Sequence, residues 1–272
     1  MPELPEVETT RRGIEPHIQG QIISKIDIRN GSLRWPVPAG LTETLPGQMV
    51  KQIDRRAKYL LLRCDSGTLI IHLGMSGRLH VLDNDNDIGK HDHVDICFSN
   101  GKVLRYTDPR RFGAVLWSEA DTDLHPLIAH LGPEPLSAEF NADYLLNRAK
   151  GRSANIKSFI MNGEIVVGVG NIYANEALFM AGVHPARAAG KVTAKQVEKL
   201  VAAIKQVLEK ALEAGGTTLR DFRKSDGMPG YFAQQLNVYG RQNQPCLTCH
   251  NPISCIRQAQ RATYFCQHCQ PE

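Results

Sequence analysis

Short apolar runs separated by turn signals fill the first half of the chain, whereas apolar residues at helical spacing fill most of the second half. The β-type runs lie at residues 22–28, 49–53, 59–64, 68–73, 78–82, 94–98, 103–106 and 114–117. Turn-forming sequences such as Asp65-Ser66-Gly67 separate them. Strands this short and this regularly spaced predict an antiparallel sandwich or barrel. A helix is predicted before them over residues 6–14.

The pattern changes after residues 131–135, where two prolines and a glycine disfavour both helix and strand. Helices are predicted beyond this point at residues 138–149, 156–161, 171–181 and 193–214. The last has a continuous apolar stripe, with Thr193 as its cap and Gly215-Gly216 at its end. Residues 217–230 are polar and contain glycine, which predicts a mobile loop, and the tail from Asn237 onward reads as a separate small unit.

Cysteine spacing in the tail predicts a metal site. Two Cys-x2-Cys pairs, separated by 16 residues, supply the candidate ligands Cys246, Cys249, Cys266 and Cys269. Two such turns can present four thiolates to one tetrahedral zinc ion, and the residues between them are predicted to form a β-hairpin. A redox dithiol is the alternative, but it does not explain two pairs at this spacing. Zinc would supply the folding energy of so small a unit.

Charge and composition narrow the class of protein. The formal net charge is +4, which permits a nucleic-acid partner without requiring one. No apolar run approaches the roughly 20 residues of a membrane span, and the acidic N-terminus does not resemble a signal peptide. An odd number of cysteines without an export signal favours metal binding in a reducing compartment over disulfides. We therefore expect a cytoplasmic protein.

The first residues, Met1-Pro2-Glu3-Leu4-Pro5-Glu6-Val7-Glu8, offer candidate chemistry. Removal of Met1 would leave Pro2 with a secondary amine, and an α-amino group titrates near pH ~8, so that a usable fraction is neutral and nucleophilic. Attack on an aldehyde carbon would give an iminium ion, and Glu3 is placed to move protons. The alternative is that these residues only cap a helix.

Further polar clusters suggest contacts with nucleic acid. Lys58 precedes an apolar strand and is a candidate phosphate contact or proton donor, the alternative being a solvated strand end. The loop Arg110-Arg111-Phe112-Gly113 could place a cation and an aromatic wedge into a duplex. Glycines before Asn171 let the backbone approach a phosphate at a helix N-terminus. Taken alone, Arg261 on the zinc hairpin reads as a solvated surface charge.

Together these motifs resemble formamidopyrimidine-DNA glycosylase, the bacterial family that removes 8-oxoguanine and ring-opened purines. The resemblance covers essentially the whole chain and implies an α+β multidomain fold with DNA bound between its parts. The implied domains are an N-terminal β-sandwich catalytic domain (1–131), a linker (132–137), a helix–two-turns–helix DNA-binding domain (138–236) and a four-cysteine zinc finger (237–272). Residues 217–230 match the loop that closes over the flipped base.

The resemblance also assigns roles to single residues. Pro2 is similar to the nucleophile that attacks C1′, Glu3 to its acid/base partner, Lys58 to the proton donor of β-elimination, and Arg261 to the residue that holds the phosphate and assists δ-elimination. The implied DNA contacts are His72, Met75, His91, Arg110, Phe112, Arg152 and Asn171. Arg110 would face the orphaned cytosine. Arg152 is included because Ser153 stands where the family often has a basic residue.

The expected function is therefore base-excision repair by a bifunctional DNA glycosylase/AP lyase that acts on double-stranded DNA containing oxidised bases. One structural Zn²⁺, a monomeric state and a location on the bacterial nucleoid are implied. An endonuclease VIII-type glycosylase for oxidised pyrimidines is one alternative, although that relative usually carries glycine where this chain has Leu4. A non-catalytic zinc-finger DNA-binding protein is the other, if Met1 is retained.

Overall fold

The computed structural model describes residues 2–83, 87–216 and 236–272. These residues divide into two compact units, one comprising 2–129 with 214–216 and the other 130–213 with 236–272. No described helix is both long and apolar enough to cross a membrane. The predicted mobile loop at 217–230 lies outside the described residues.

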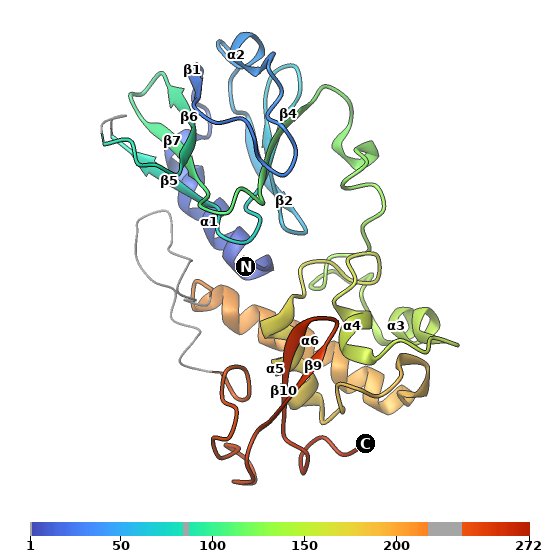
Figure 1. Ribbon diagram of the computed structural model, residues 1–272. Coiled ribbons are helices and arrows are strands. Elements are labelled where there is room, and N and C mark those ends of the chain that lie inside the picture. The colour runs from blue at the N-terminus through green and yellow to red at the C-terminus, as the bar shows by residue number, and fades with distance from the viewer. Residues whose placement is uncertain (1, 84–86, 217–235) are drawn as a thin grey trace. The chain divides into compact units, whose positions relative to one another are not determined.

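Within residues 2–83 and 87–129, the chain forms two four-stranded antiparallel sheets (Figure 1). One has the order β1-β6-β7-β5 and the other β2-β3-β4-β8. The strands are β1 (Ile23–Ile28), β2 (Gln52–Arg56), β3 (Tyr59–Arg63), β4 (Thr68–His72), β5 (Arg78–Leu82), β6 (Asp92–Phe98), β7 (Val103–Thr107) and β8 (Ala114–Ser118). The two sheets share one apolar core, which includes Ile96 and Leu104 from one sheet and Leu60 and Ile71 from the other. The predicted antiparallel sandwich is confirmed.

Helix α1 (Leu4–Ile18) joins this core through its apolar face. Val7, Ile14 and Ile18 are buried there, and the helix packs on β2 and β3 of one sheet and on β5 of the other. Two short helical turns, α2 (Leu41–Thr44) and η1 (Thr122–Leu124), complete the unit.

Residues 130–213 are mainly helical. The elements are α3 (Ala142–Ala149), α4 (Ile156–Ile160), α5 (Asn171–Ala181), η2 (Ala189–Lys191) and α6 (Ala194–Glu213). Helix α6 buries its apolar stripe and packs on α3 and α5. The predicted cap is present, because the Thr193 hydroxyl accepts from the Gln196 backbone N–H at 3.3 Å.

The tail forms the predicted antiparallel hairpin from β9 (Ser254–Gln258) and β10 (Arg261–Phe265). A small cluster built on Val238, Cys246, Ile253 and Cys266 supports it. Phe179 of α5 packs against this cluster, and α5 contacts β10. The finger therefore rests on the helical part of its own unit.

Two predicted elements begin at least three residues later in the structure than expected. Residues 49–53 were expected as a strand, but Met49 makes only an isolated bridge with Ile22, and the ladder begins at Gln52. The helix expected from residue 138 begins at Ala142, because Asn141 caps it: the Asn141 side chain accepts from the Tyr144 N–H at 2.9 Å.

Candidate active site and zinc centre

The N-terminal residues do form a helix cap, and Glu3, which follows Pro2, is its N-cap residue. The Glu3 backbone N–H donates to Glu6 Oε2 at 2.9 Å, and the Glu3 side chain accepts from the Glu6 backbone, which is a capping box. Pro2, Glu3 and Glu6 are all buried. The helix-cap interpretation and the chemical one are therefore compatible, because Glu3 is both the N-cap residue of α1 and the residue that follows Pro2 in the chain.

Lys58 lies in the two-residue turn between β2 and β3. Arg56 pairs with Tyr59 across the turn, so the turn consists of Ala57 and Lys58. Ala57 has φ 55°, a left-handed conformation that costs energy for any residue with a Cβ. The turn belongs to a strand pair that packs on α1.

His72 ends β4 next to this turn, because it pairs with Tyr59 and their rings lie 4.9 Å apart. Burial, with the charges of Lys58 and Arg34, lowers the pKa of His72 to about 4. Its Nδ1 accepts from the Gly74 N–H at 3.1 Å. The imidazole is therefore neutral at pH 7 and carries its proton on Nε2, where it can donate a hydrogen bond to a phosphate oxygen.

The loop with Arg110 and Phe112 is built around the buried carboxylate of Asp108. This carboxylate accepts from the Ser76 hydroxyl at 2.6 Å, and from the backbone N–H groups of Arg110 at 3.2 Å and Gly113 at 2.9 Å. The exposed Phe112 side chain is covered by the Arg110 guanidinium, 4.9 Å from the ring centre. The loop thus presents the predicted cation and aromatic wedge on a rigid support.

Glycines allow this loop to approach the turn that carries Met75. A Cβ on Gly113 would lie 1.7 Å from Tyr106 Oη and 2.4 Å from the His72 carbonyl oxygen. A Cβ on Gly74 would lie 2.4 Å from the Phe112 carbonyl carbon. Met75 is half-buried in this turn, so the three residues expected to fill the space of the extruded base come from two adjoining loops.

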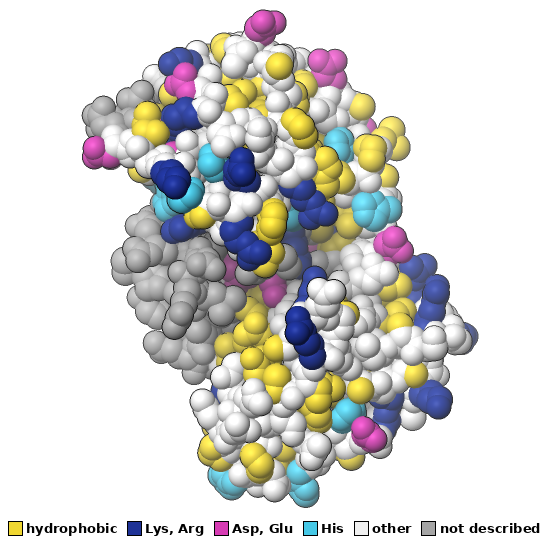
Figure 2. Space-filling model, in the orientation of Figure 1, with side chains coloured by type: hydrophobic (Ala, Val, Ile, Leu, Met, Phe, Trp, Pro, Cys, Tyr) yellow, Lys and Arg dark blue, Asp and Glu magenta, His cyan; other side chains and the backbone are white. Residues whose placement is uncertain are grey.

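Arg34 is a candidate that the sequence analysis missed. It is exposed, it forms no ion pair with a described residue, and its charge acts on both His72 and Tyr59. Its backbone N–H donates to the Gly113 carbonyl at 3.2 Å, and its guanidinium lies 4.7 Å from the Trp35 ring centre. The one feature of the sequence that could have indicated Arg34 is its position directly before a tryptophan, Trp35. In Figure 2, Lys and Arg side chains gather on the lower part of the visible face of this unit.

The four predicted cysteines meet in the second unit. The Sγ atoms of Cys246, Cys249, Cys266 and Cys269 all lie within 4.8 Å of one another, and they form the single cluster of its kind among the described residues. The Cys246–Cys269 and Cys249–Cys266 sulfur pairs are 3.9 and 3.4 Å apart. A tetrahedral zinc–thiolate site has edges of about 3.8 Å, given Zn–S bonds of about 2.3 Å.

Hydrogen bonds to sulfur also fit a thiolate site. The Thr248 N–H points to Cys246 Sγ at 3.4 Å, and the Asn251 side-chain amide points to Cys249 Sγ at 3.5 Å. Such outer contacts orient metal ligands. The donor set and its spacing therefore fit one structural Zn²⁺, and Cys255 lies outside the cluster.

Arg261 and Asn171 belong to this second unit, and Asn171 bonds to the residue that follows Arg261 in β10. The Asn171 side chain donates to the Ala262 carbonyl at 3.1 Å, and buried Lys157 donates to the same oxygen at 3.0 Å and to Thr263 Oγ1 at 2.7 Å. Arg261 is exposed at the start of β10 and lines a pocket of about 250 Å³ together with Lys157 and Ser158. The lining of this pocket thus includes two cationic side chains, Lys157 and Arg261.

The remaining predicted contacts, His91 and Arg152, are exposed on loops. The predicted site residues are divided between the two units. The first unit contains Pro2, Glu3, Lys58, His72, Met75, His91, Arg110 and Phe112, and the second contains Arg152, Asn171, Arg261 and the four cysteines.

Glu176 is a structural residue that the sequence analysis missed. Its buried carboxylate accepts from the backbone N–H groups of Asn237, Val238 and Tyr239 at 2.8–2.9 Å.

Models of known protein families match this chain along nearly its whole length. Residues 1–115 match the formamidopyrimidine-DNA glycosylase N-terminal domain, residues 131–223 the H2TH domain of the same enzyme, and residues 243–271 the zinc finger found in FPG and IleRS. The formamidopyrimidine-DNA glycosylase of Hydrogenovibrio crunogenus is 59% identical over 272 residues, which cover 100% of this chain and 97% of that protein.

Solved structures agree with these matches. Lactococcus lactis Fpg bound to DNA containing N7-benzyl-Fapy-dG has a TM-score of 0.92 at 32% identity, covering 100% of both chains. The same protein bound to abasic-site DNA also has a TM-score of 0.92, at 31% identity, covering 99% of this chain and 100% of that one. The chain belongs to the formamidopyrimidine-DNA glycosylase family.

Proposed function

We propose that this protein excises oxidised purines, such as 8-oxoguanine and formamidopyrimidines, from duplex DNA and then cleaves the strand by β,δ-elimination. The observation that carries the proposal is the N-terminal end of α1, where the buried Glu3, which follows Pro2 in the chain, is held by a capping box with Glu6. Full-length similarity to enzymes of this name and to a relative bound to Fapy-containing and abasic DNA supports the same reaction.

Base removal is assigned to Pro2 and Glu3. After Met1 is removed, the Pro2 nitrogen is a secondary amine that attacks C1′ of the extruded nucleotide, and Glu3 transfers the protons of base loss and sugar ring opening. The resulting iminium ion acidifies the neighbouring C2′ position and so prepares the strand for elimination. The flipped nucleotide is required because C1′ is out of reach while the base is stacked.

Strand cleavage is assigned to Lys58 and Arg261. Lys58 donates the proton in β-elimination, and Arg261 holds the phosphate and assists δ-elimination. Arg261 projects from a hairpin that Lys157 and Asn171 tie to the helical part of the unit. The four cysteines that flank this hairpin in the chain would hold the zinc ion, which would help to keep β10 in place. When bound, zinc supplies folding energy rather than chemistry.

DNA contacts are assigned to the residues on the exposed loops. His72 and Asn171 contact phosphates, His91 and Arg152 contact the backbone, and Met75, Arg110 and Phe112 fill the space of the extruded base. We add Arg34, which is exposed and whose charge acts on His72. With this assignment, residues 1–131 form the catalytic domain, 138–236 bind DNA and 237–272 form the zinc finger, in a monomer located on the bacterial nucleoid.

The test is product analysis on three duplexes, containing 8-oxoguanine opposite cytosine, a formamidopyrimidine, or thymine glycol. We expect faster excision of the two purine lesions and a one-nucleotide gap with phosphate at both ends. Preference for thymine glycol would favour the endonuclease VIII-type alternative instead. Binding of all three duplexes without cleavage would favour a non-catalytic DNA-binding protein.

A further inference from the structure

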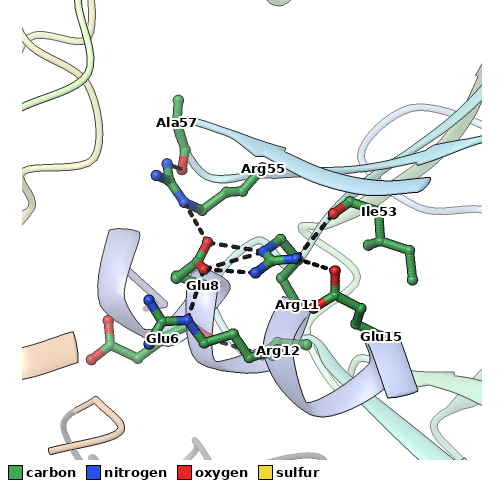
Figure 3. Close-up of polar contacts among 9 residues, drawn as sticks. Glu6, Glu8, Arg11, Arg12, Glu15, Ile53, Arg55 and Ala57 are labelled. Atoms are coloured by element: carbon green, nitrogen blue, oxygen red, sulfur yellow. Dashed lines mark hydrogen bonds and ion pairs between the residues drawn. The ribbon is translucent and has the colours of Figure 1, made fainter. Parts of the chain in front are cut away.

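A buried ion cluster joins the first helix to the strand that leads into the Lys58 turn. Glu8 of α1 accepts from Arg11 at 3.1 Å, from Arg12 at 2.9 Å and from Arg55 of β2 at 3.1 Å (Figure 3). The Glu8 and Arg55 side chains are only 13% and 14% exposed, whereas Arg12 is 57% exposed. Glu8 thus has a buried partner on the sheet and an exposed partner on its own helix.

Arg55 uses its second nitrogen to hold the turn itself. Its Nη1 donates to the Ala57 carbonyl oxygen at 2.9 Å while its Nε donates to Glu8 (Figure 3). The Ala57 carbonyl is part of the peptide bond that leads to Lys58. A planar guanidinium can bridge two acceptors in one fixed orientation, so Arg55 links the orientation of this peptide to the position of Glu8 on the helix.

The turn needs such a support because its backbone is strained. Ala57 has φ 55°, and non-glycine residues in this region persist when the surrounding structure holds them. The helix does not depend on the same contact for its attachment. Arg11 Nη1 independently donates to the Ile53 carbonyl of β2 at 3.1 Å, and the apolar face of α1 packs into the sandwich core.

We propose that Glu8 and Arg55 are positioning residues that set the Lys58 turn relative to the start of α1. Glu8 lies five residues beyond Glu3, about 7.5 Å along the helix axis at about 1.5 Å per residue. The chain Glu8–Arg55–Ala57 therefore connects the helix that carries the proline nucleophile to the backbone that carries the proton donor. The proposal rests on the proposed function, which gives Lys58 its role in elimination.

The electrostatics of the cluster favour this arrangement. Burial raises the pKa of Glu8, but the hydrogen bonds from Arg11 and Arg12 and the charge of Arg55 outweigh it, so that the pKa lies below its ordinary value. Glu8 is thus ionised at pH 7. Without its charge, Arg11 and Arg55, which both donate to Glu8 Oε2, would repel each other.

The test compares Arg55→Gln with Arg12→Gln, because each variant removes one guanidinium from the same carboxylate. Single-turnover cleavage of a duplex with a preformed abasic site is measured, together with the Kd for that duplex and the thermal midpoint of each variant. We expect Arg55→Gln to slow cleavage by about tenfold or more, since small displacements of a catalytic group are costly. Arg12→Gln should stay within about twofold of the wild type, and the Kd should be unchanged for both.

The second part repeats Arg55→Gln in a Lys58→Ala background. If Arg55 acts through Lys58, the substitution has no further effect on the residual cleavage there. A purely structural role would reduce cleavage by the same factor in both backgrounds, which would overturn the proposal. If Arg55→Gln is unfolded at the assay temperature, Arg55→Lys replaces it, because lysine keeps the charge but cannot bridge both acceptors.

The outcomes separate this proposal from the proposed function. Equal rates for Arg55→Gln and Arg12→Gln, in an active wild type, would refute the positioning role and leave the lyase function intact. A wild type that does not cleave the abasic duplex would overturn the lyase function and the positioning role with it.

Discussion

His72 illustrates how the fold changes the chemistry of a single residue. In the sequence it is one of ten histidines. In the structure, burial and two nearby cations keep it neutral, and one hydrogen bond fixes its tautomer. Tyr106 is a parallel case, because burial and Asp108 raise its pKa and keep its hydroxyl available as a donor to that carboxylate at 3.1 Å. Neither state could be inferred from residue type.

The charge state of His72 can be tested by NMR. We expect the imidazole to remain neutral, with the proton on Nε2, from pH 7 down to about pH 4. Because an exposed histidine in the unfolded chain titrates near pH ~6.5, the unfolded chain binds this proton first as the pH falls. His72 therefore reduces stability as the pH drops from about 6.5 towards 4, and has no such effect above that range. Titration close to 6.5 in the folded protein would contradict this account.

At the scale of elements, local sequence determined most of the strands and helices but not all their ends. The strand at residues 78–82 and the helix at residues 171–181 have the predicted bounds, because a turn or a glycine marks each end. The strand predicted at residues 49–53 begins only at Gln52, because Met49 forms a bridge with the distant Ile22 instead of pairing with β3. Hydrophobic pattern alone does not report such long-range pairing.

The loop on Asp108 gives a prediction for glycine packing. Gly113→Ala should destabilise the protein by about 1–3 kcal/mol, the usual cost of forcing atoms into a filled site, since its Cβ would meet Tyr106 Oη at 1.7 Å. Affinity for lesion-containing DNA should fall with it as Arg110 and Phe112 move. Gly40→Ala is the control, because its Cβ would meet nothing within 4 Å. Urea unfolding measures the difference, and equal stability of the two variants would refute the packing argument.

The zinc finger gives a second prediction at this scale. Native mass spectrometry should find one zinc ion per chain in the wild type and a loss of zinc in Cys249→Ser. Because β10 carries Arg261, loss of the ion should also reduce strand cleavage and raise hydrogen exchange in residues 246–269. Cys255→Ser is the control, since Cys255 lies in the same hairpin but outside the cluster. Full zinc occupancy in Cys249→Ser would contradict the four-thiolate site.

At the scale of the whole molecule, the proposed site draws on residues far apart in sequence. The sequence proposed roles for Pro2, Lys58 and Arg261 through motifs and a family resemblance. It did not identify Arg34 or the Glu8–Arg55 pair, because their significance depends on neighbours 38 and 47 positions away. The role of such a charged residue cannot be predicted from the sequence around it, because it depends on partners that only the fold brings close.

Electrostatics of the whole chain predict a salt dependence for DNA binding. Each phosphate contact contributes about 0.9 to the slope of log K against log salt concentration. Arg34→Ala should therefore weaken binding and lower that slope by about one unit. Lys25→Ala is the matched control, because Lys25 is exposed on β1 and paired with Asp27. An unchanged slope for Arg34→Ala would show that Arg34 does not contact a phosphate.

The central claim is that Pro2 is the nucleophile, and borohydride trapping tests it most directly. The protein is incubated with a duplex containing 8-oxoguanine opposite cytosine, the reductant is added, and the covalent complex is digested and mapped by mass spectrometry. We predict a cross-link at the Pro2 nitrogen, which requires that Met1 has been removed. A cross-link at a lysine, or intact duplex binding without any cross-link, would contradict the claim.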